Sequence, residues 1–124
     1  MVAGSSILVI DRSHETREVL RLALERRGLR VLAATDSSVG WAMARLHHPE
    51  IVVFDLDSDD LAKPSVREFA ASIQQQRGTL VILGNPALES NFPVGEFIAK
   101  PYHYKPLVLK IEELLRKRFC RVAA

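Results

Sequence analysis

The chain has 124 residues, of which 48% are hydrophobic and 26% are charged, and its formal net charge is +2 at pH 7. This length and composition are those of one globular domain, 1–124, that can bury a core of its own. The small net charge gives no reason to expect a nucleic-acid partner, and no apolar run is long enough to cross a membrane. The single cysteine, Cys120, cannot form an internal disulfide, so we expect a reducing, cytoplasmic environment.

Apolar runs alternate with amphipathic segments along the chain. Five short runs are predicted to be strands, at residues 7–10, 29–34, 51–54, 79–83 and 96–99. The segments between them are predicted to be helices, except that 87–95 contains Asn91 and Pro93 and is expected to form a single turn or an irregular loop. A final helix is predicted to open at Pro106. Such alternation indicates a parallel sheet with helices on both faces.

Small polar residues mark where the first three helices are expected to start. Ser13 is predicted to cap the first helix, and either Ser37 or Ser38 the second. Ser65 and Glu68 have the spacing of a capping box for the third helix. In each case a side-chain oxygen can accept a hydrogen bond from an N–H group that the helix itself leaves unsatisfied.

The third apolar run is followed directly by carboxylates. Residues 51–54 are all apolar, which indicates a strand buried on both faces, and Asp55, Asp57, Asp59 and Asp60 come next. In an open α/β sheet the chemistry takes place just beyond the carboxyl ends of the strands. An aspartate there suits a nucleophile or a metal ligand. An acidic turn that only solvates the strand end is the alternative.

Three polar residues stand at predicted carboxyl ends of strands. Asp11 follows the first strand, Asp55 the third and Lys100 the fifth. In a doubly wound sheet of flavodoxin-like order 2-1-3-4-5, these strand ends are neighbours and the side chains converge. Two carboxylates and a lysine then make a site for a divalent metal or a phosphoryl group.

At this point the sequence resembles the receiver domain of two-component response regulators, over about residues 6–118. The resemblance depends on three motifs in the right order and spacing, Ile7–Asp11, Pro49–Asp55 and Phe97–Pro101. It implies a flavodoxin-like, doubly wound, five-stranded parallel sheet of order 2-1-3-4-5. It also implies phosphorelay signal transduction, in which an aspartate takes a phosphoryl group from a histidine kinase with Mg²⁺ bound nearby.

The resemblance assigns a role to each matching residue. Asp55 would be the phosphoacceptor, Asp11 the retained residue of the acidic pocket and Lys100 the contact to the phosphoryl group. Phe97 falls on the aromatic switch position, and a cis peptide is expected before Pro101. The implied partners are a histidine kinase or another signalling protein, with an output domain possible in a longer chain, and the domain itself is not expected to be an enzyme.

Two positions depart from the family pattern. Arg12 replaces a second acidic metal ligand, and Gly84 replaces the serine or threonine whose hydroxyl follows the phosphoryl group. The segment between Gly84 and Lys100 is also about one and a half helical turns shorter than the family pattern, so the fourth helix is expected to be short or missing. These departures predict an atypical, pseudo-receiver-like interaction module with impaired phosphorylation at Asp55 and either no cofactor or weakly bound Mg²⁺.

Three alternatives remain at this stage. Asp57 could lean in beside Asp11 and Asp55 as a metal ligand, and Arg12 could turn outward, so that the chain would be a conventional phospho-accepting receiver. The remote alternative is a haloacid dehalogenase-like phosphatase, because Val53–Asp57 resembles the first motif of that family. That family places the motif on its first strand, whereas two predicted strands precede it here.

Overall fold

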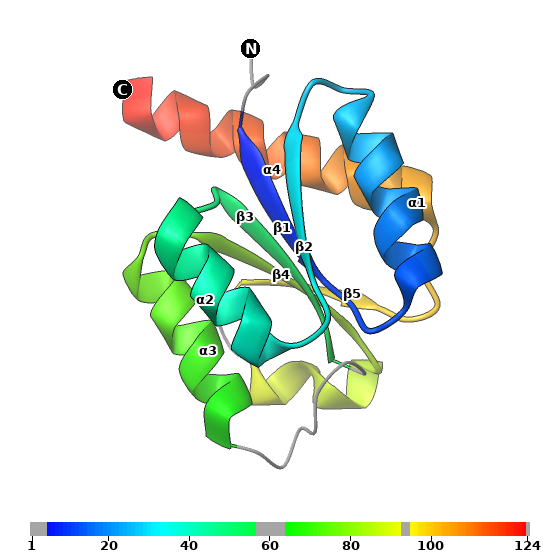
Figure 1. Cartoon of the computed structure of the whole chain (residues 1–124), viewed down its shortest axis with the longest axis vertical. Helices are drawn as coiled ribbons and strands as arrows, with labels where there is room; N and C mark the ends of the chain where they lie inside the picture. The colour runs from blue at the N-terminus through cyan, green and yellow to red at the C-terminus, as the bar shows by residue number, and fades with distance from the viewer. Residues whose placement is uncertain (1–4, 57–63, 93–94, 124) are drawn as a thin grey trace.

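Five strands form one parallel sheet of order β2-β1-β3-β4-β5 (Figure 1). The computed structural model describes residues 5–56, 64–92 and 95–123. In chain order the elements are β1 (Ser6–Ile10), α1 (His14–Glu25), β2 (Arg30–Ala34), α2 (Ser37–His47), β3 (Ile51–Asp55), α3 (Pro64–Gln75), β4 (Thr79–Gly84), the 3-10 helix η2 (Pro86–Asn91), β5 (Glu96–Ala99) and α4 (Tyr104–Ala123). The flavodoxin-like fold predicted from the sequence is therefore confirmed. No helix in the described ranges is both long and apolar enough to span a membrane.

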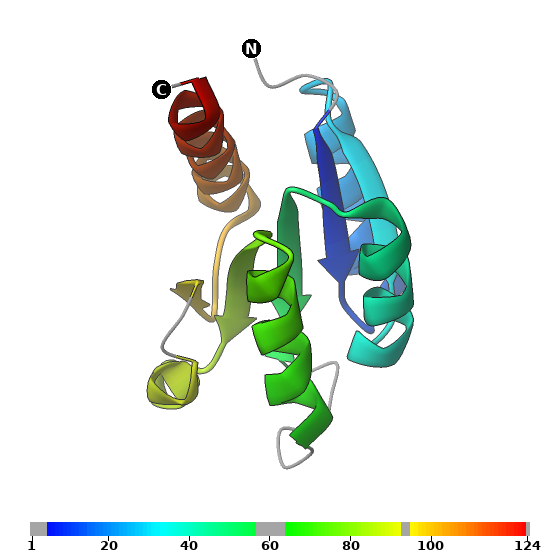
Figure 2. The same cartoon turned by 90° about the vertical axis from the view of Figure 1, so that its left-hand side faces the viewer.

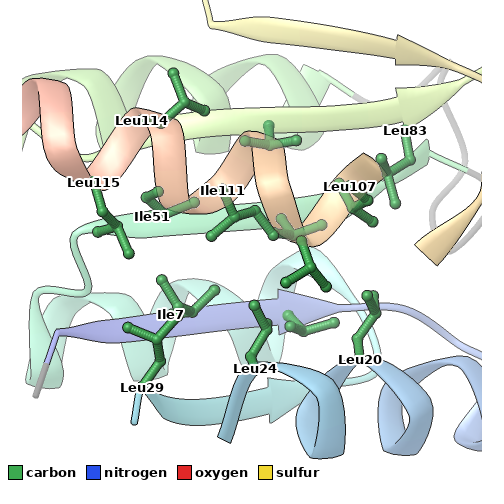
Figure 3. Packing of buried hydrophobic residues seen from close by; sticks show 14 residues of the cluster. Ile7, Leu20, Leu24, Leu29, Ile51, Leu83, Leu107, Ile111, Leu114 and Leu115 are labelled. Atoms are coloured by element: carbon green, nitrogen blue, oxygen red, sulfur yellow. The ribbon is translucent and has the colours of Figure 1, made fainter. Parts of the chain in front are cut away.

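Two layers of helices enclose the sheet, with α1 and α4 on one face and α2 and α3 on the other (Figure 1 and Figure 2). Successive side chains of a strand point to opposite faces, so odd- and even-numbered strand residues enter different cores. The α1–α4 core contains odd-numbered residues of β1, β3 and β4 together with Leu20 and Leu24 of α1 and the apolar stripe of α4 (Figure 3). The α2–α3 core contains the even-numbered residues of the same strands.

The α1–α4 core consists of Ile7, Val9, Leu20, Leu24, Leu29, Ile51, Val53, Val81, Leu83, Leu107, Val108, Ile111, Leu114 and Leu115. The α2–α3 core consists of Leu8, Ile10, Ala34, Ala44, Val52, Phe54, Leu56, Val66, Phe69, Ala70, Ile73, Leu80, Ile82 and Phe92. Every residue of β3 is buried, as the unbroken apolar run at 51–54 predicts. The central strands are therefore rigid supports for whatever follows their carboxyl ends.

The caps of the first two helices are formed by different residue types. Ser13 caps α1 as predicted, because its hydroxyl accepts a hydrogen bond from the Thr16 N–H at 3.3 Å. The cap of α2 is Asp36, whose carboxylate accepts from the Val39 N–H at 2.9 Å. The prediction of a serine cap there is wrong, because an aspartate one residue earlier caps as well as serine does.

The last two long helices begin earlier than their sequence signals indicate. Helix α3 begins at Pro64, one residue before Ser65, and the side chain of Ser65 lies outside the described part of the structure, so the capping box stays a prediction. Proline is favoured at this position because its missing N–H would have no helical partner. Helix α4 begins at Tyr104, two residues before Pro106. Both starts lie at the same edge of the sheet as the carboxyl ends of the strands.

The short segment after β4 is the 3-10 helix η2, of six residues. It is the only described structure between Gly84 and β5, and it is not a regular α-helix of three turns. The prediction that the helix between Gly84 and Lys100 is short or missing is therefore confirmed; this is the segment of η2 and not the final helix α4. Asn85 caps it by accepting a hydrogen bond from the Ala87 N–H at 2.9 Å.

Candidate functional site

The carboxyl ends of β1, β3 and β5 bring Asp11, Asp55 and Lys100 together. Asp55 is the last residue of β3, while Asp11 and Lys100 directly follow β1 and β5. Lys100 Nζ lies 2.7 Å from Asp55 Oδ1 and 2.8 Å from Oδ2, so the ammonium donates to both carboxylate oxygens. Asp11 is 4% exposed and Asp55 is 6% exposed. The peptide bond between Lys100 and Pro101 is cis, as expected.

Asp11 is held firmly except at one oxygen atom. Its N–H donates to the Ala34 carbonyl at 3.0 Å, and its Oδ1 accepts from the Ser13 N–H at 2.8 Å. Arg17 Nη1 donates to the carbonyl oxygens of Asp11 at 2.6 Å and Arg12 at 3.1 Å, which fixes the loop between β1 and α1. Asp11 Oδ2 is buried and has no hydrogen-bond partner among the described residues.

The environment of Asp11 favours its neutral form. Burial raises the pKa of Asp11 from 3.8 to about 6, and the neighbouring Asp55 carboxylate adds to the rise. The Ser13 N–H and the charge of Lys100 act in the opposite direction. The ionised form of Asp11 is therefore disfavoured by its burial, and a proton or a cation near Asp11 Oδ2 would relieve this cost.

The residues of the site fit a divalent cation bound by oxygen. Hard cations such as Mg²⁺ take carboxylate oxygens as ligands, and Asp11 Oδ2 is a buried carboxylate oxygen that no donor of the described residues satisfies. Within residues 5–56, 64–92 and 95–123 there is no cluster of three or more histidine, cysteine or acidic side chains. Asp57, the further metal ligand that the sequence suggests beside Asp11 and Asp55, lies outside the described residues.

Comparisons with known proteins agree with this arrangement. The chain is 28% identical over 127 aligned positions to the response regulator GtcR of Aneurinibacillus migulanus, covering 94% of this chain and 50% of that protein. It is 26% identical over 117 positions to TcrX of Mycobacterium tuberculosis, which is named a transcriptional regulatory protein, covering 90% of this chain and 50% of the relative. No protein-family model matches the chain.

Solved structures share the architecture. A receiver domain protein from Clostridium thermocellum superposes with a TM-score of 0.76 at 21% identity, covering 94% of this chain and 98% of the other. A redox sensor of streptococci, described as evolved from two-component response regulators, gives a TM-score of 0.81 at 19% identity over 98% of this chain and 56% of the other. The fold is that of a response regulator receiver domain. The chain spans about half the length of the curated relatives it matches.

Arg12 follows Asp11, at the position where the receiver pattern has a second acidic residue. Its side chain is exposed. Lys100 is the cation whose charge lowers the pKa of Asp11. An exposed position is ordinary for a long basic side chain, which keeps its guanidinium in water. The acidic pocket therefore keeps its buried carboxylates while its outer edge carries a positive residue.

Gly84 lies at the end of β4, and Leu56 fills the space beside it. A Cβ atom placed on Gly84 would lie 2.8 Å from Leu56 Cδ1, closer than real side chains approach. Leu56 is fully buried in the α2–α3 core. The corner where the receiver pattern places a hydroxyl is thus occupied by an apolar side chain. The sequence signals the missing hydroxyl but gives no sign of the leucine that replaces it.

Phe97, which the receiver pattern predicts to be the aromatic switch, lies in β5. It pairs in register with Ile82 of β4 and is half-buried. Its side chain packs against the α2–α3 core, as does Leu88 of η2. The short segment after β4 therefore still contributes an apolar side chain to this core.

Tyr102 and Arg17 are further residues near the site, and the three sequence motifs assign them no role. Tyr102 is half-buried against the α1–α4 core, with its ring centroid 5.8 Å from that of Tyr104 at an interplanar angle of 85°. Burial raises the pKa of Tyr102 above its usual range, and the charges of Asp11 and Asp55 add to the rise. The signal for Tyr102 in the sequence is its place directly after Lys100 and Pro101, and Arg17 has none.

Proposed function

We propose that this chain is the receiver domain of a two-component response regulator, acting mainly as a protein-interaction module with impaired Mg²⁺-dependent phosphorylation at Asp55. The observation that carries the proposal is the Lys100–Asp55 ion pair beside the buried Asp11 at the carboxyl ends of neighbouring strands. Because the chain spans about half of its curated relatives, we include an output domain in a longer protein among its partners.

The chemistry assigned to the site is phosphoryl transfer. An Asp55 oxygen would form a bond to phosphorus as the phosphorus–nitrogen bond to a kinase histidine breaks. Lys100 Nζ already contacts both Asp55 oxygens and is placed to donate to an oxygen of the transferred group. Asp11 and Asp55 would hold Mg²⁺, which supplies positive charge against the charge that builds up during transfer.

Two substitutions support the impaired form of this function. Arg12 adds a positive charge where the receiver pattern has a metal ligand, and this weakens the attraction of the pocket for a divalent cation. Gly84 has no hydroxyl to bind the phosphoryl group, and Leu56 fills the space where one would lie. The partner would then recognise a fixed surface rather than a phosphorylation-dependent one.

The second candidate is a conventional phospho-accepting receiver. It is favoured by the buried Asp11 Oδ2, which has no hydrogen-bond donor among the described residues, and by the exposed side chain of Arg12. Both features leave room for a cation of ordinary affinity in the pocket. The partner and the reaction would be the same, and the difference lies in the affinity for Mg²⁺ and in the extent of phosphorylation.

Mg²⁺ titration followed by phosphorylation with acetyl phosphate separates the two candidates. Mg²⁺ binding to the full chain is measured by NMR, and phosphorylation of Asp55 by intact mass. If the chain is an impaired receiver, we expect the Mg²⁺ titration not to saturate at millimolar concentration and Asp55 to be little phosphorylated. Arg12→Asp should then tighten Mg²⁺ binding by about tenfold or more, because it replaces a charge that repels the cation with one that attracts it.

Two controls make the result specific. Arg116→Asp reverses an exposed charge on α4 and should leave the Mg²⁺ affinity unchanged. Asp55→Asn should abolish the added mass of a phosphoryl group. Saturation of the unmodified chain at millimolar Mg²⁺, together with stoichiometric phosphorylation that Asp55→Asn removes, would establish the conventional receiver instead.

A further inference from the structure

A pocket of about 590 Å³ lies at the opposite end of the sheet from the acidic site. It is formed where α3 ends, β4 and β5 begin and the second half of α4 passes (Figure 2). Its lining residues are Gln74, Arg77, Gly78, Thr79, Leu80, Gly95 and Arg118. This volume is within the range of small-molecule sites, which is roughly 300–1,000 Å³.

The described lining residues include two arginines and no acidic residue. Arg77 comes from just after α3 and Arg118 from α4, 41 residues apart in the chain. Arg118 Nη1 donates to the Arg77 carbonyl oxygen at 2.6 Å and to Thr79 Oγ1 at 3.1 Å. Neutral acceptors thus fix this half-buried guanidinium in place, and no described residue of the lining carries a negative charge to compensate it.

Arg77 has a strained backbone. Its φ is +65°, in the left-handed region that favours glycine, at the position that ends α3. The adjacent Gly78 closes the helix end by donating from its N–H to the Ile73 carbonyl at 3.0 Å. Glycine would adopt this left-handed conformation at position 77 with less strain, so the turn does not explain why an arginine stands there. Strain of this kind is often retained where a side chain serves a ligand.

We propose that this pocket binds a small molecule bearing a phosphate group, with Arg118 and Arg77 as its charge-bearing contacts. Guanidinium groups match phosphate oxygens in pairs of parallel hydrogen bonds, and the Thr79 hydroxyl and Gln74 amide add neutral donors. The volume of about 590 Å³ is that of a small-molecule site, and this favours a small molecule over an acidic protein segment. The site is separate from Asp55, so it does not depend on the function proposed above.

The test uses inorganic pyrophosphate as the probe on the ¹⁵N-labelled full chain, in EDTA and physiological salt. We expect saturable shifts of the Gly78, Thr79 and Gly95 amides, with a dissociation constant of about 1 mM or tighter. Arg118→Gln and Arg77→Gly should each weaken binding at least about fivefold. Arg77→Gly should also leave the melting temperature unchanged or higher, because glycine relieves the left-handed backbone.

Arg116→Gln is the matched control, because it removes the same charge from an exposed position on the same helix. It should leave the affinity within about twofold of the unmodified chain if the pocket binds the anion. Equal weakening by Arg116→Gln and Arg118→Gln would overturn the proposal, as would shifts confined to residues near Lys100. Tighter binding of an acidic decapeptide than of pyrophosphate at the same amides would replace the small molecule with a protein segment.

Discussion

Asp11 is a buried group of the site whose Oδ2 has no donor in the part of the chain that the structure describes. Its other carboxylate oxygen and its N–H are hydrogen-bonded, and Arg17 binds the Asp11 carbonyl oxygen. Burial and the nearby Asp55 carboxylate disfavour the charged form of this aspartate in the metal-free protein. The pH dependence of stability should therefore report on this residue.

Asp11→Asn is expected to stabilise the metal-free protein by about 1–3 kcal/mol at pH 7.5. The pKa of Asp11 is about 6 in the folded state and 3.8 ordinarily, so folding takes up a proton between these values. Its contribution to stability is thus complete below pH 3.8 and is lost as the pH rises through about 6. Urea unfolding in EDTA at pH 7.5 and pH 4.5 should show the advantage of the asparagine variant shrinking at the lower pH.

The control for this measurement is Glu68→Gln, which neutralises an exposed carboxylate of α3. It should change the stability by no more than about 0.5 kcal/mol at either pH. An asparagine variant that is less stable than the unmodified protein at pH 7.5 would contradict the prediction, because it would mean that the buried carboxylate is net stabilising.

Gly84→Thr is expected to destabilise the fold by about 1–3 kcal/mol, because the new side chain meets Leu56 in a filled corner. Leu56→Ala removes the atoms that collide, although it leaves a cavity of its own when introduced alone. The double variant should be destabilised by about 1 kcal/mol or more less than the sum of the two single destabilisations. Urea unfolding of all four proteins gives this coupling.

The control pair combines Gly84→Thr with Ile73→Ala. Ile73 is buried in the same core but is not among the atoms nearest to Gly84. These two changes should be additive within about 0.5 kcal/mol. Equal coupling in both pairs would mean that Leu56 has no special relation to Gly84.

At the scale of elements, η2 and β5 form the most unusual part of the sheet. β5 has four residues and lies at the edge, paired with β4 alone, and η2 replaces a full helix beside it. A short 3-10 segment holds little structure by itself, so its order depends on packing through Leu88 and the adjacent Phe92. The ring of Phe97 packs against the same core.

Phe97 is expected to keep one side-chain conformation when a phosphoryl mimic occupies Asp55. Position 84 has no hydroxyl to follow the mimic, and the ring is packed against the α2–α3 core. Phenylalanine-labelled protein, observed by NMR with beryllofluoride and Mg²⁺, should show one set of Phe97 signals throughout. Phe69 in the core provides an internal reference. Exchange between two Phe97 conformations on addition of the mimic would contradict the prediction.

The whole molecule contains two cores separated by the sheet. The α1–α4 core and the α2–α3 core share strands but not side chains, because alternate residues point to opposite faces. Each helix layer therefore stabilises the fold through its own set of contacts. Mutations in different cores should act independently, whereas neighbours within one core should not.

Ile111→Val and Ile73→Val test this separation, since Ile111 lies in the α1–α4 core and Ile73 in the α2–α3 core. Each should cost about 0.5–1.5 kcal/mol, and the double variant should cost the sum within about 0.5 kcal/mol. Phe54 and Phe69 are the contrasting pair, with ring centroids 5.3 Å apart at 79°. Their replacement by leucine should show a coupling of about 0.5–1.5 kcal/mol in urea unfolding.

The strand order, the two helix layers and the meeting of Asp11, Asp55 and Lys100 were predictable from the sequence. Apolar runs and helical spacing are local patterns, and parallel strands always present their carboxyl ends at the same edge. The shortened segment before β5 was predictable for the same reason, since nine residues containing Asn91 and Pro93 cannot form a packed helix.

Only the tertiary structure determined which side chains share a space. Leu56 beside Gly84, the buried Asp11 Oδ2 without a donor, and Arg118 bound to the carbonyl of Arg77 all depend on how distant segments pack. No periodicity in the chain encodes these contacts, because a sequence pattern fixes which face a residue occupies and not which neighbour it meets there. That neighbour is set by the register of the strands and the placement of the helices on the sheet.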